Sequence, residues 1–213
     1  MFRLLKSAAK RSFGRSRAAK AAASDPLRFD LEAFRRREVF RDNYRLIADA
    51  LHKTIDFQST LDLGCANGFL MQEFLTQNKS VLGVELSADV INVLPPTLSD
   101  YVIVGDATKV GELGRFDLVC CVEVAEHVPP EASASLVATI ASNASKWVYF
   151  TAAGPCQPGH GHINCRQQFY WINEFRKHGI SIAWEETERF LSLISGIRPA
   201  VWLEWNSLLF RVN

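Results

Sequence analysis

The sequence has almost no excess of charge of either sign, because 24 lysines and arginines stand against 23 aspartates and glutamates in 213 residues. Such a balance gives the chain no general attraction for nucleic acid or for an anionic membrane. The basic residues are unevenly placed, since residues 1–24 hold seven of them and no acid. A basic arm, residues 1–26, therefore precedes a mildly acidic body, residues 27–213.

The arm lacks an apolar run as long as that of a secretory signal, and it is not a membrane span. We expect residues 1–26 to be poorly ordered. Their composition, rich in arginine, serine and alanine, also fits an organellar transit peptide or an arm that touches phosphate or anionic lipid.

The sequence has only five cysteines and no Cys-x-x-Cys motif. Cys65, Cys120 and Cys121 fall in or beside expected buried strands, so we interpret them as small core side chains in a reducing compartment. A cytoplasmic location follows as the expectation.

Beyond the arm, the sequence has no internal repeats and no low-complexity tracts. With 48% hydrophobic residues in 213, the chain is expected to form one domain. Apolar residues recur at helical spacing from Leu31 to about Lys53. Short apolar runs then alternate with helical or turn segments, which predicts a mostly parallel sheet. The predicted strands are 60–63, 80–84, 101–104, 116–122 and 147–151.

The last third of the chain has a different pattern. A loop rich in glycine, proline and histidine (153–164) precedes a predicted helix (167–178). Predicted strands at 180–185 and 202–212 would form an antiparallel hairpin at one edge of the sheet, and the aromatic residues of 202–210 are assigned to structure. Phe169 and Trp171 are likewise expected in the core.

A Gly-x-Gly-x-x-Gly turn and a phosphate-binding lysine are both missing. Instead, an apolar strand ends at Asp62 and is followed by a Gly-x-x-x-Gly turn, Gly64 to Gly68, and then a helix. In an open α/β sheet, ligands bind at the carboxyl ends of the strands. The next two strands also end in acids, Glu85 and Asp106, which suit a ribose and an adenine amino group.

This series of segments, from about Thr60 to Pro130, resembles the class I methyltransferases that use S-adenosylmethionine (SAM). The resemblance implies an α/β, Rossmann-like, seven-stranded and mostly parallel sheet with an antiparallel last strand and helices on both faces. It also implies SAM as the cofactor, held by Asp62, Gly64, Cys65, Ala66, Gly68, Glu85, Leu86, Asp106, Ala107 and Glu123. The alternatives are an NAD-linked oxidoreductase, which the missing glycine pattern disfavours, and a SAM-binding partner protein without turnover.

The fourth strand is followed by Glu123, Glu126 and His127, which share one face if the turn is helical. This Glu-x-x-Glu-His run is similar to the metal-binding motif of small-RNA 2′-O-methyltransferases and of O-methyltransferases of ubiquinone synthesis. The resemblance implies a site for Mg²⁺ or Mn²⁺ made by Glu123, Glu126, His127 and a downstream histidine, His162. The alternative is a metal-free turn in which a glutamate caps the loop.

The histidine loop supplies His160 and His162, and the segment resembles bacterial and phage-type methyltransferases whose acceptors are often sugars. A histidine needs little adjustment of its pKa to accept a proton near neutral pH. We therefore predict an O-methyltransferase with His162, His127 and His160 as candidate catalytic residues. The first acceptor class is a sugar or other small hydroxyl compound, and RNA is the second, supported by the metal motif and the basic arm.

Overall fold

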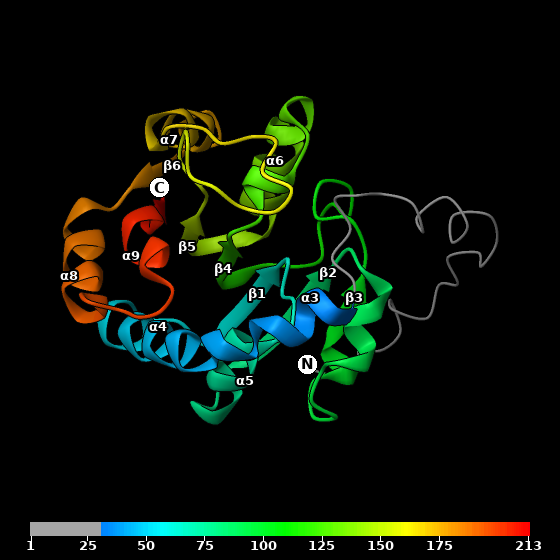
Figure 1. The fold of residues 1–213 in the computed structure, drawn as a ribbon. Helices are drawn as coiled ribbons and strands as arrows, with labels where there is room; N and C mark the ends of the chain where they lie inside the picture. The colour runs from blue at the N-terminus through cyan, green and yellow to red at the C-terminus, as the bar shows by residue number, and fades with distance from the viewer. Residues whose placement is uncertain (1–30) are drawn as a thin grey trace.

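The first five predicted strands are present in the computed structural model, which describes residues 31–213, and with two shorter C-terminal strands they form a single seven-stranded sheet (Figure 1). The basic arm predicted over residues 1–26 lies outside the described residues. The strand order is β3-β2-β1-β4-β5-β7-β6, with β1 to β5 parallel and β7 antiparallel to both β5 and β6. The strands are β1 (Ser59–Leu63), β2 (Ser80–Glu85), β3 (Val102–Val104), β4 (Phe116–Val122), β5 (Ala144–Thr151), β6 (Ile180–Ile182) and β7 (Leu208–Val212).

The sheet reverses its winding between β1 and β4, which are neighbours in space although β2 and β3 separate them in sequence. At such a point the connections leave in opposite directions, and a crevice opens outside the carboxyl ends of the strands. The topology therefore predicts a ligand site at the ends of β1 and β4.

Each face of the sheet carries its own apolar core. Along β4, Leu118 and Cys120 belong to one cluster of buried residues, whereas Val119 and Cys121 belong to the other. Successive side chains of a strand point to opposite faces, so this strand contributes to both cores. The expectation of buried Cys65, Cys120 and Cys121 is confirmed, and all five cysteines are free thiols.

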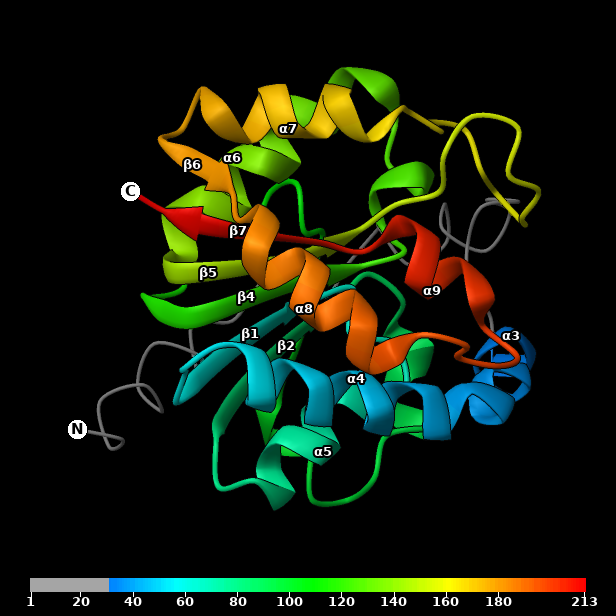
Figure 2. The same cartoon turned by 90° about the vertical axis from the view of Figure 1, so that its left-hand side faces the viewer.

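Helices cover both faces, as Figure 2 shows. One face carries α4 (Arg41–Thr54), α5 (Phe69–Thr76) and α8 (Trp184–Ile194), and the other carries α6 (Ser133–Asn143) and α7 (Gln168–Arg176). On α4 the buried residues Tyr44, Ile47 and Leu51 recur at intervals of three and four. Burying one such apolar side chain stabilises the fold by about 1.5–3 kcal/mol. No helix within residues 31–213 is long and apolar enough to cross a bilayer.

The C-terminal third differs from the sequence prediction. The predicted strand 180–185 ends at Ile182, and α8 begins at Trp184. The predicted strand 202–212 begins only at Leu208, because α9 (Val201–Asn206) precedes it. β6 and β7 do pair at the sheet edge, but two helices connect them, so the hairpin prediction was wrong. The segment of α8 mixes polar and apolar residues, and its buried side chains follow helical spacing. They are Thr187, Phe190 and Ile194.

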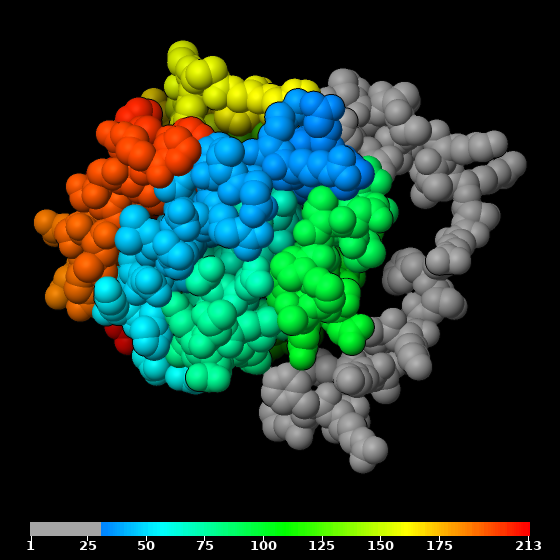
Figure 3. All heavy atoms as spheres, turned by 60° about the horizontal axis from the view of Figure 1, so that its bottom comes forward, coloured from blue at the N-terminus to red at the C-terminus, as the bar shows by residue number. Residues whose placement is uncertain are grey.

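Short helical segments cover the carboxyl ends of the strands. The predicted helix from Leu31 to Lys53 is interrupted: α3 (Leu31–Arg36) is followed by a 3₁₀ turn, η2 (Arg37–Phe40), and then by α4. Asn67 Nδ2 donates a 2.9 Å hydrogen bond to the Phe34 carbonyl, which fixes α3 over the turn after β1. Figure 3 shows this blue segment at the surface, beside the green segment that holds η3 (Ala88–Asn92) and η4 (Ser99–Tyr101).

Candidate functional site

The turn between β1 and α5 has the geometry that its glycines predict. Gly64 adopts φ +81°, and its N–H donates a 2.7 Å hydrogen bond to the Val84 carbonyl. A Cβ atom on Gly64 would lie 2.3 Å from Val124 Cγ2, so a side chain cannot be accommodated. Gly68 directly precedes α5, and Cys65 is buried between the two glycines. The backbone of the turn therefore stays close to the end of β4.

Glu85 lies at the tip of β2, beside this turn. One carboxylate oxygen accepts a 3.1 Å hydrogen bond from the N–H of Ala66, and the other accepts one of 2.9 Å from the N–H of Ser87. A carboxylate has about four lone-pair positions, so these two bonds leave capacity for a ligand. Leu86, the next residue, is 67% exposed.

Asp106 follows β3 and caps the next turn. Its carboxylate accepts hydrogen bonds from the Thr108 N–H (2.9 Å) and hydroxyl (2.7 Å), and from Lys109 Nζ (2.7 Å). Ala107 is half-buried beside it. The structure therefore shows a capping role for Asp106, and its predicted contact with adenine stays a prediction.

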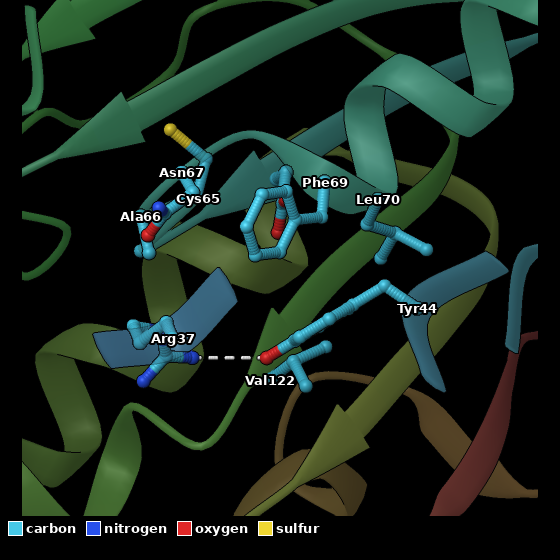
Figure 4. Close-up of a pocket in the computed structure, with 10 residues that line it drawn as sticks. Arg37, Tyr44, Cys65, Ala66, Asn67, Phe69, Leu70 and Val122 are labelled. Atoms are coloured by element: carbon cyan, nitrogen blue, oxygen red, sulfur yellow. Dashed lines mark hydrogen bonds between the residues drawn. The ribbon is translucent and has the colours of Figure 1, made fainter. Parts of the chain in front are cut away.

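A cation and a phenol lie over the Gly64 turn, and neither was predicted from the sequence. Arg37 Nη2 donates a 2.9 Å hydrogen bond to the Tyr44 hydroxyl (Figure 4). Interaction with Tyr44, and more weakly with Glu85 and Glu123, raises the pKa of Arg37 despite its burial. The cavity at the turn has a volume of only about 10 Å³ and is lined by Arg37, Tyr44, Asp62, Gly64, Cys65, Ala66, Asn67, Phe69, Leu70 and Val122. This space is smaller than a ligand the size of a nucleoside.

Asp62 lies at the end of β1 within the same small cavity. Burial raises its pKa to about 7, the Glu85 carboxylate adds to this effect, and Arg37 opposes it. The Asp62 carboxylate is therefore costly to ionise until a cation approaches it.

Glu123 follows β4 in a strained conformation, with φ +54°. Its N–H donates to both the carbonyl (3.2 Å) and the hydroxyl (2.9 Å) of Thr151, and its Oε1 accepts a 3.0 Å hydrogen bond from Asn206 Nδ2. Backbone strain of this kind is maintained only where the surrounding contacts enforce it, and it is concentrated at functional sites.

Glu126, His127 and His162 come together at the carboxyl end of β4. One possible ligand atom from each lies within 4.8 Å of the others. Glu123, which the metal prediction included, is not part of this group, because the turn is a 3₁₀ segment, η5 (Ala125–His127), and begins after Glu123. The side chain of Glu126 is fully buried, and neither of its oxygens makes a well-formed hydrogen bond, although the Ala153 N–H and the Glu123 carboxyl lie near it. Burial, and then the neighbouring Glu123 carboxylate, raise the pKa of Glu126.

Backbone carbonyls orient both imidazoles. Nδ1 of His127 lies 3.1 Å from the Gly161 carbonyl oxygen, and Nδ1 of His162 lies 3.1 Å from that of Gln157. A ring nitrogen beside a carbonyl carries the proton, so the lone pair is on Nε2 in each ring. Burial lowers the pKa of His127 to about 4, which makes its imidazole neutral and weakly basic at pH 7.

The histidine loop is clamped to the β4 turn through Asn164. The N–H groups of Ile163 and Asn164 both donate 2.9 Å hydrogen bonds to the Glu126 carbonyl. The buried Asn164 side chain donates to the Ala125 carbonyl (3.2 Å) and to the Ser133 hydroxyl (2.8 Å). These contacts hold His162 against Glu126 and His127, although more than thirty residues separate them in sequence.

A second cavity, of about 450 Å³, adjoins the small one through Arg37 and Tyr44. It contains all three histidines that were predicted to act in catalysis. It is lined by Arg37, Phe40, Tyr44, Glu123, Glu126, His127, Gln157, Pro158, Gly159, His160, His162, Ala200, Trp202, Leu203 and Trp205. Its volume is in the range of small-molecule binding sites in proteins.

Sequence reasoning missed the aromatic part of this cavity. Trp202 and Trp205 were assigned to a core strand, but both are on α9 and face the cavity. Phe169, expected in the core, is 65% exposed, whereas the burial of Trp171 is confirmed. The sequence shows Arg37 and Tyr44 only as part of a segment with helical spacing and does not indicate a role at the site. That role depends on how the N-terminal segment folds back over the sheet.

Comparison with known proteins gives a consistent family. Residues 33–183 match the family model described as a methyltransferase domain. Ubiquinone biosynthesis O-methyltransferases are similar over part of the chain: the one from Albidiferax ferrireducens is 29% identical over 102 residues, covering 44% of this chain and 40% of the relative. That from Burkholderia ambifaria strain MC40-6 is 30% identical over 108 residues, covering 47% and 46%. The matches thus cover less than half the length of these relatives.

Solved structures share the fold at low sequence identity. Magnesium protoporphyrin IX methyltransferase from Synechocystis, with bound SAH, superposes with a TM-score of 0.61 at 15% identity, covering 91% of each chain. A SAM-bound amino pentose methyltransferase from Micromonospora echinaspora gives a TM-score of 0.61 at 16% identity, covering 89% of this chain and 99% of that one.

Proposed function

The chain belongs to the class I SAM-dependent methyltransferases, and on this premise we propose that it transfers the methyl group of SAM to a hydroxyl of a sugar or other small acceptor. The observation that carries the proposal is the pair of adjoining cavities at the switch point of the sheet. One lies on the glycine turn and the other holds the imidazoles, so a donor and an acceptor bound there would meet at the end of β4.

The cofactor would lie across the ends of β1, β2 and β3. We assign Glu85 to the ribose hydroxyls, and Leu86, Asp106 and Ala107 to the adenine. The turn from Gly64 through Cys65 and Ala66 to Gly68 would approach the cofactor with its backbone. Two of the solved relatives named above contain SAM or its demethylated product, SAH, which supports SAM as the donor.

The methionine end of SAM is zwitterionic, and the small cavity offers a matching pair of charges. Asp62 would face the ammonium group, and Arg37 would face the carboxylate once it leaves Tyr44. Glu123 lines the larger cavity and directly follows Val122 of the smaller one, so we expect it near the sulfonium.

Methyl transfer forms a bond from the acceptor oxygen to the methyl carbon and breaks the bond from that carbon to sulfur. The acceptor must be aligned with the methyl group, and its hydroxyl proton must leave. We assign this proton to Nε2 of His162, because the Gln157 carbonyl fixes Nδ1 as the protonated nitrogen. His127, whose pKa is lowered by burial, would orient the acceptor from the other side, and His160 lines the same cavity.

As an alternative to a proton acceptor at His162, the group of Glu126, His127 and His162 fits a divalent cation, since one Nε2 lone pair cannot both accept the proton and bind the metal. The buried carboxylate of Glu126 and the two Nε2 lone pairs are suitable ligands, and carbonyls behind histidines are the usual supporting shell of such sites. Two imidazoles and one carboxylate suit Mn²⁺ or Zn²⁺ better than Mg²⁺. A cation bound there would polarise the acceptor hydroxyl. Metal content measured after dialysis, in wild type and in Glu126→Gln, would test this part separately from activity.

Calorimetric titration with SAM and SAH tests the donor site. Glu85→Ala should lose most cofactor affinity, because a charged hydrogen bond to each ribose hydroxyl contributes about 1.5–3 kcal/mol. His162→Ala should bind SAM normally and lose turnover by a factor of about 10² to 10⁴. Full turnover in His162→Ala would show that the proton acceptor is misassigned, and SAM binding without turnover in wild type would favour a partner protein.

A further inference from the structure

The acceptor cavity has an aromatic wall on one side, supplied mostly by the short helix α9. Trp202 and Trp205 of this helix line the cavity together with Phe40 of η2. Trp205 is 67% exposed, so much of its surface is open to contact with a ligand. Figure 2 shows α9 between the yellow loop that carries the histidines and the blue N-terminal segment.

This wall is held in place from three directions. The rings of Phe40 and Trp202 meet edge to face, with centroids 5.4 Å apart and an interplanar angle of 83°. The carbonyl of Trp205 accepts a 2.9 Å hydrogen bond from Gln168 Nε2 of α7. At the end of α9, Asn206 donates to Glu123. The ring of Trp202 is therefore held against η2, and the backbone of α9, which carries Trp205, is anchored to α7 and to the end of β4.

Most of the surface that lines the cavity is apolar, and several hydrogen-bonding groups lie within it. Arg37, Gln157 and His160 lie around it together with the carboxylates and imidazoles described above. Of these groups only Glu126 is fully buried, and Glu123, His127 and His162 are half-buried. A ligand that leaves a buried group of this kind unpaired loses about 1–3 kcal/mol of binding free energy for each one. A hydrocarbon or a simple phenol would satisfy few of these groups. A ring with an apolar C–H face and several hydroxyls at its edge would match both the aromatic wall and the polar lining.

We propose that Trp205, with Trp202 beside it, forms a stacking subsite for the apolar face of a sugar ring, and that the methyl acceptor is a polyhydroxylated ring of this kind. The inference rests on the proposed function, in that it names the acceptor class of the same site. The ring would stack on α9 and direct one hydroxyl toward His162. Trp205 would be a specificity residue, since it touches the part of the acceptor that does not react.

The test measures binding without turnover. Protein saturated with SAH is titrated with methyl β-D-glucopyranoside, methyl α-D-mannopyranoside and methyl β-D-galactopyranoside, and separately with catechol and cyclohexanol, while tryptophan fluorescence is recorded. We expect at least one glycoside to change the fluorescence saturably and to bind about three- to tenfold more weakly in Trp205→Ala, the loss expected for an aromatic stacking contact. Trp205→Phe should recover part of the affinity.

Trp184→Ala is the matched control, because Trp184 is 62% exposed on α8 and is not among the described residues that line the cavity. This variant should bind the glycosides as wild type does. Three results would overturn the inference: binding of catechol or cyclohexanol but of no glycoside, no glycoside binding up to the solubility limit, or equal affinity in Trp205→Ala. SAH binding to each variant is measured by calorimetry, so that the two proposals can be separated. A wild-type protein that does not bind SAH contradicts the proposed function. A protein that binds SAH but no glycoside contradicts this inference alone.

Discussion

Asp62 is a residue at the site that lowers the stability of the unliganded fold and is proposed to bind the cofactor. Its carboxyl is buried beside Glu85, which raises its pKa to about 7, well above the value of 3.8 for a free side chain. Between pH 4 and pH 7, Asp62 therefore keeps its proton in the folded protein but has lost it in the unfolded chain. Folding stability from this group falls as pH rises through that window and stays low above it.

Asp62→Asn should make the unliganded protein more stable at pH 8, with little change at pH 4, in urea unfolding experiments. The same variant should bind SAM about 10- to 100-fold more weakly at pH 8, because it loses a charged hydrogen bond to the ammonium group. Wild-type affinity for SAM should rise with pH up to about 7, and that of Asp62→Asn should not. Asp56→Asn, at an exposed position, is the control. An unchanged pH dependence in Asp62→Asn would show that another group is responsible.

The position of His162 depends on the absence of a side chain at Gly159. A Cβ on Gly159 would lie 2.1 Å from Nε2 of His162, so Gly159→Ala must displace the imidazole. Gly154→Ala, in the same loop, meets no atom within 4 Å and serves as a matched control. We expect Gly159→Ala to lower kcat by at least about tenfold, because displacing a proton acceptor forfeits part of its contribution. SAM affinity should be unchanged, and equal kcat values for the two alanine variants would contradict the role of His162.

Among the elements, the histidine loop depends on one buried side chain. Asn164 links this loop to the η5 turn and to α6 through Ala125 and Ser133. Asn164→Ala leaves buried polar groups without partners, which should lower the free energy of unfolding by about 1–3 kcal/mol in urea unfolding. It should also lower kcat more than it raises the KM for SAM, since the loop positions His162 and is distant in sequence from the cofactor turn. In the control Asn213→Ala, the side chain lost makes its hydrogen bond to Ser181 at the surface, so stability should be nearly unchanged. If Asn164→Ala raised the KM for SAM and kept kcat, the loop would serve the cofactor instead.

The elements also show what sequence patterns can and cannot predict. The first five strands follow from short apolar runs, because parallel strands that are buried on both faces contain few polar residues. The edge of the sheet was harder to predict, since β6 has only three residues and α9 directly precedes β7. In α9, apolar and aromatic residues at neighbouring positions suited a buried strand as well as a helix with one face on a cavity.

For the whole molecule, the carboxyl ends of the strands could be predicted as the site, because their acids occur in one order along the chain. The closure over these ends could not be predicted. It depends on contacts between distant segments, such as the 2.6 Å hydrogen bond from Asn43 Nδ2 to the Arg198 carbonyl, 155 residues away. Local periodicity holds no information about such pairs, and for this reason Arg37, Tyr44 and the tryptophans of α9 emerged only from the structure.

Transfer of label from methyl-labelled SAM tests most directly whether the protein methylates a small acceptor. Labelled SAM is incubated with the protein and with separated pools of saccharides, small metabolites, RNA and protein, with and without a chelator, and Glu85→Ala is run in parallel. We predict label in the saccharide or small-metabolite pool, none with Glu85→Ala, and a loss on chelation if Glu126, His127 and His162 hold a cation. Label in RNA or protein instead, or no label in any pool from a protein that binds SAM, would contradict the account.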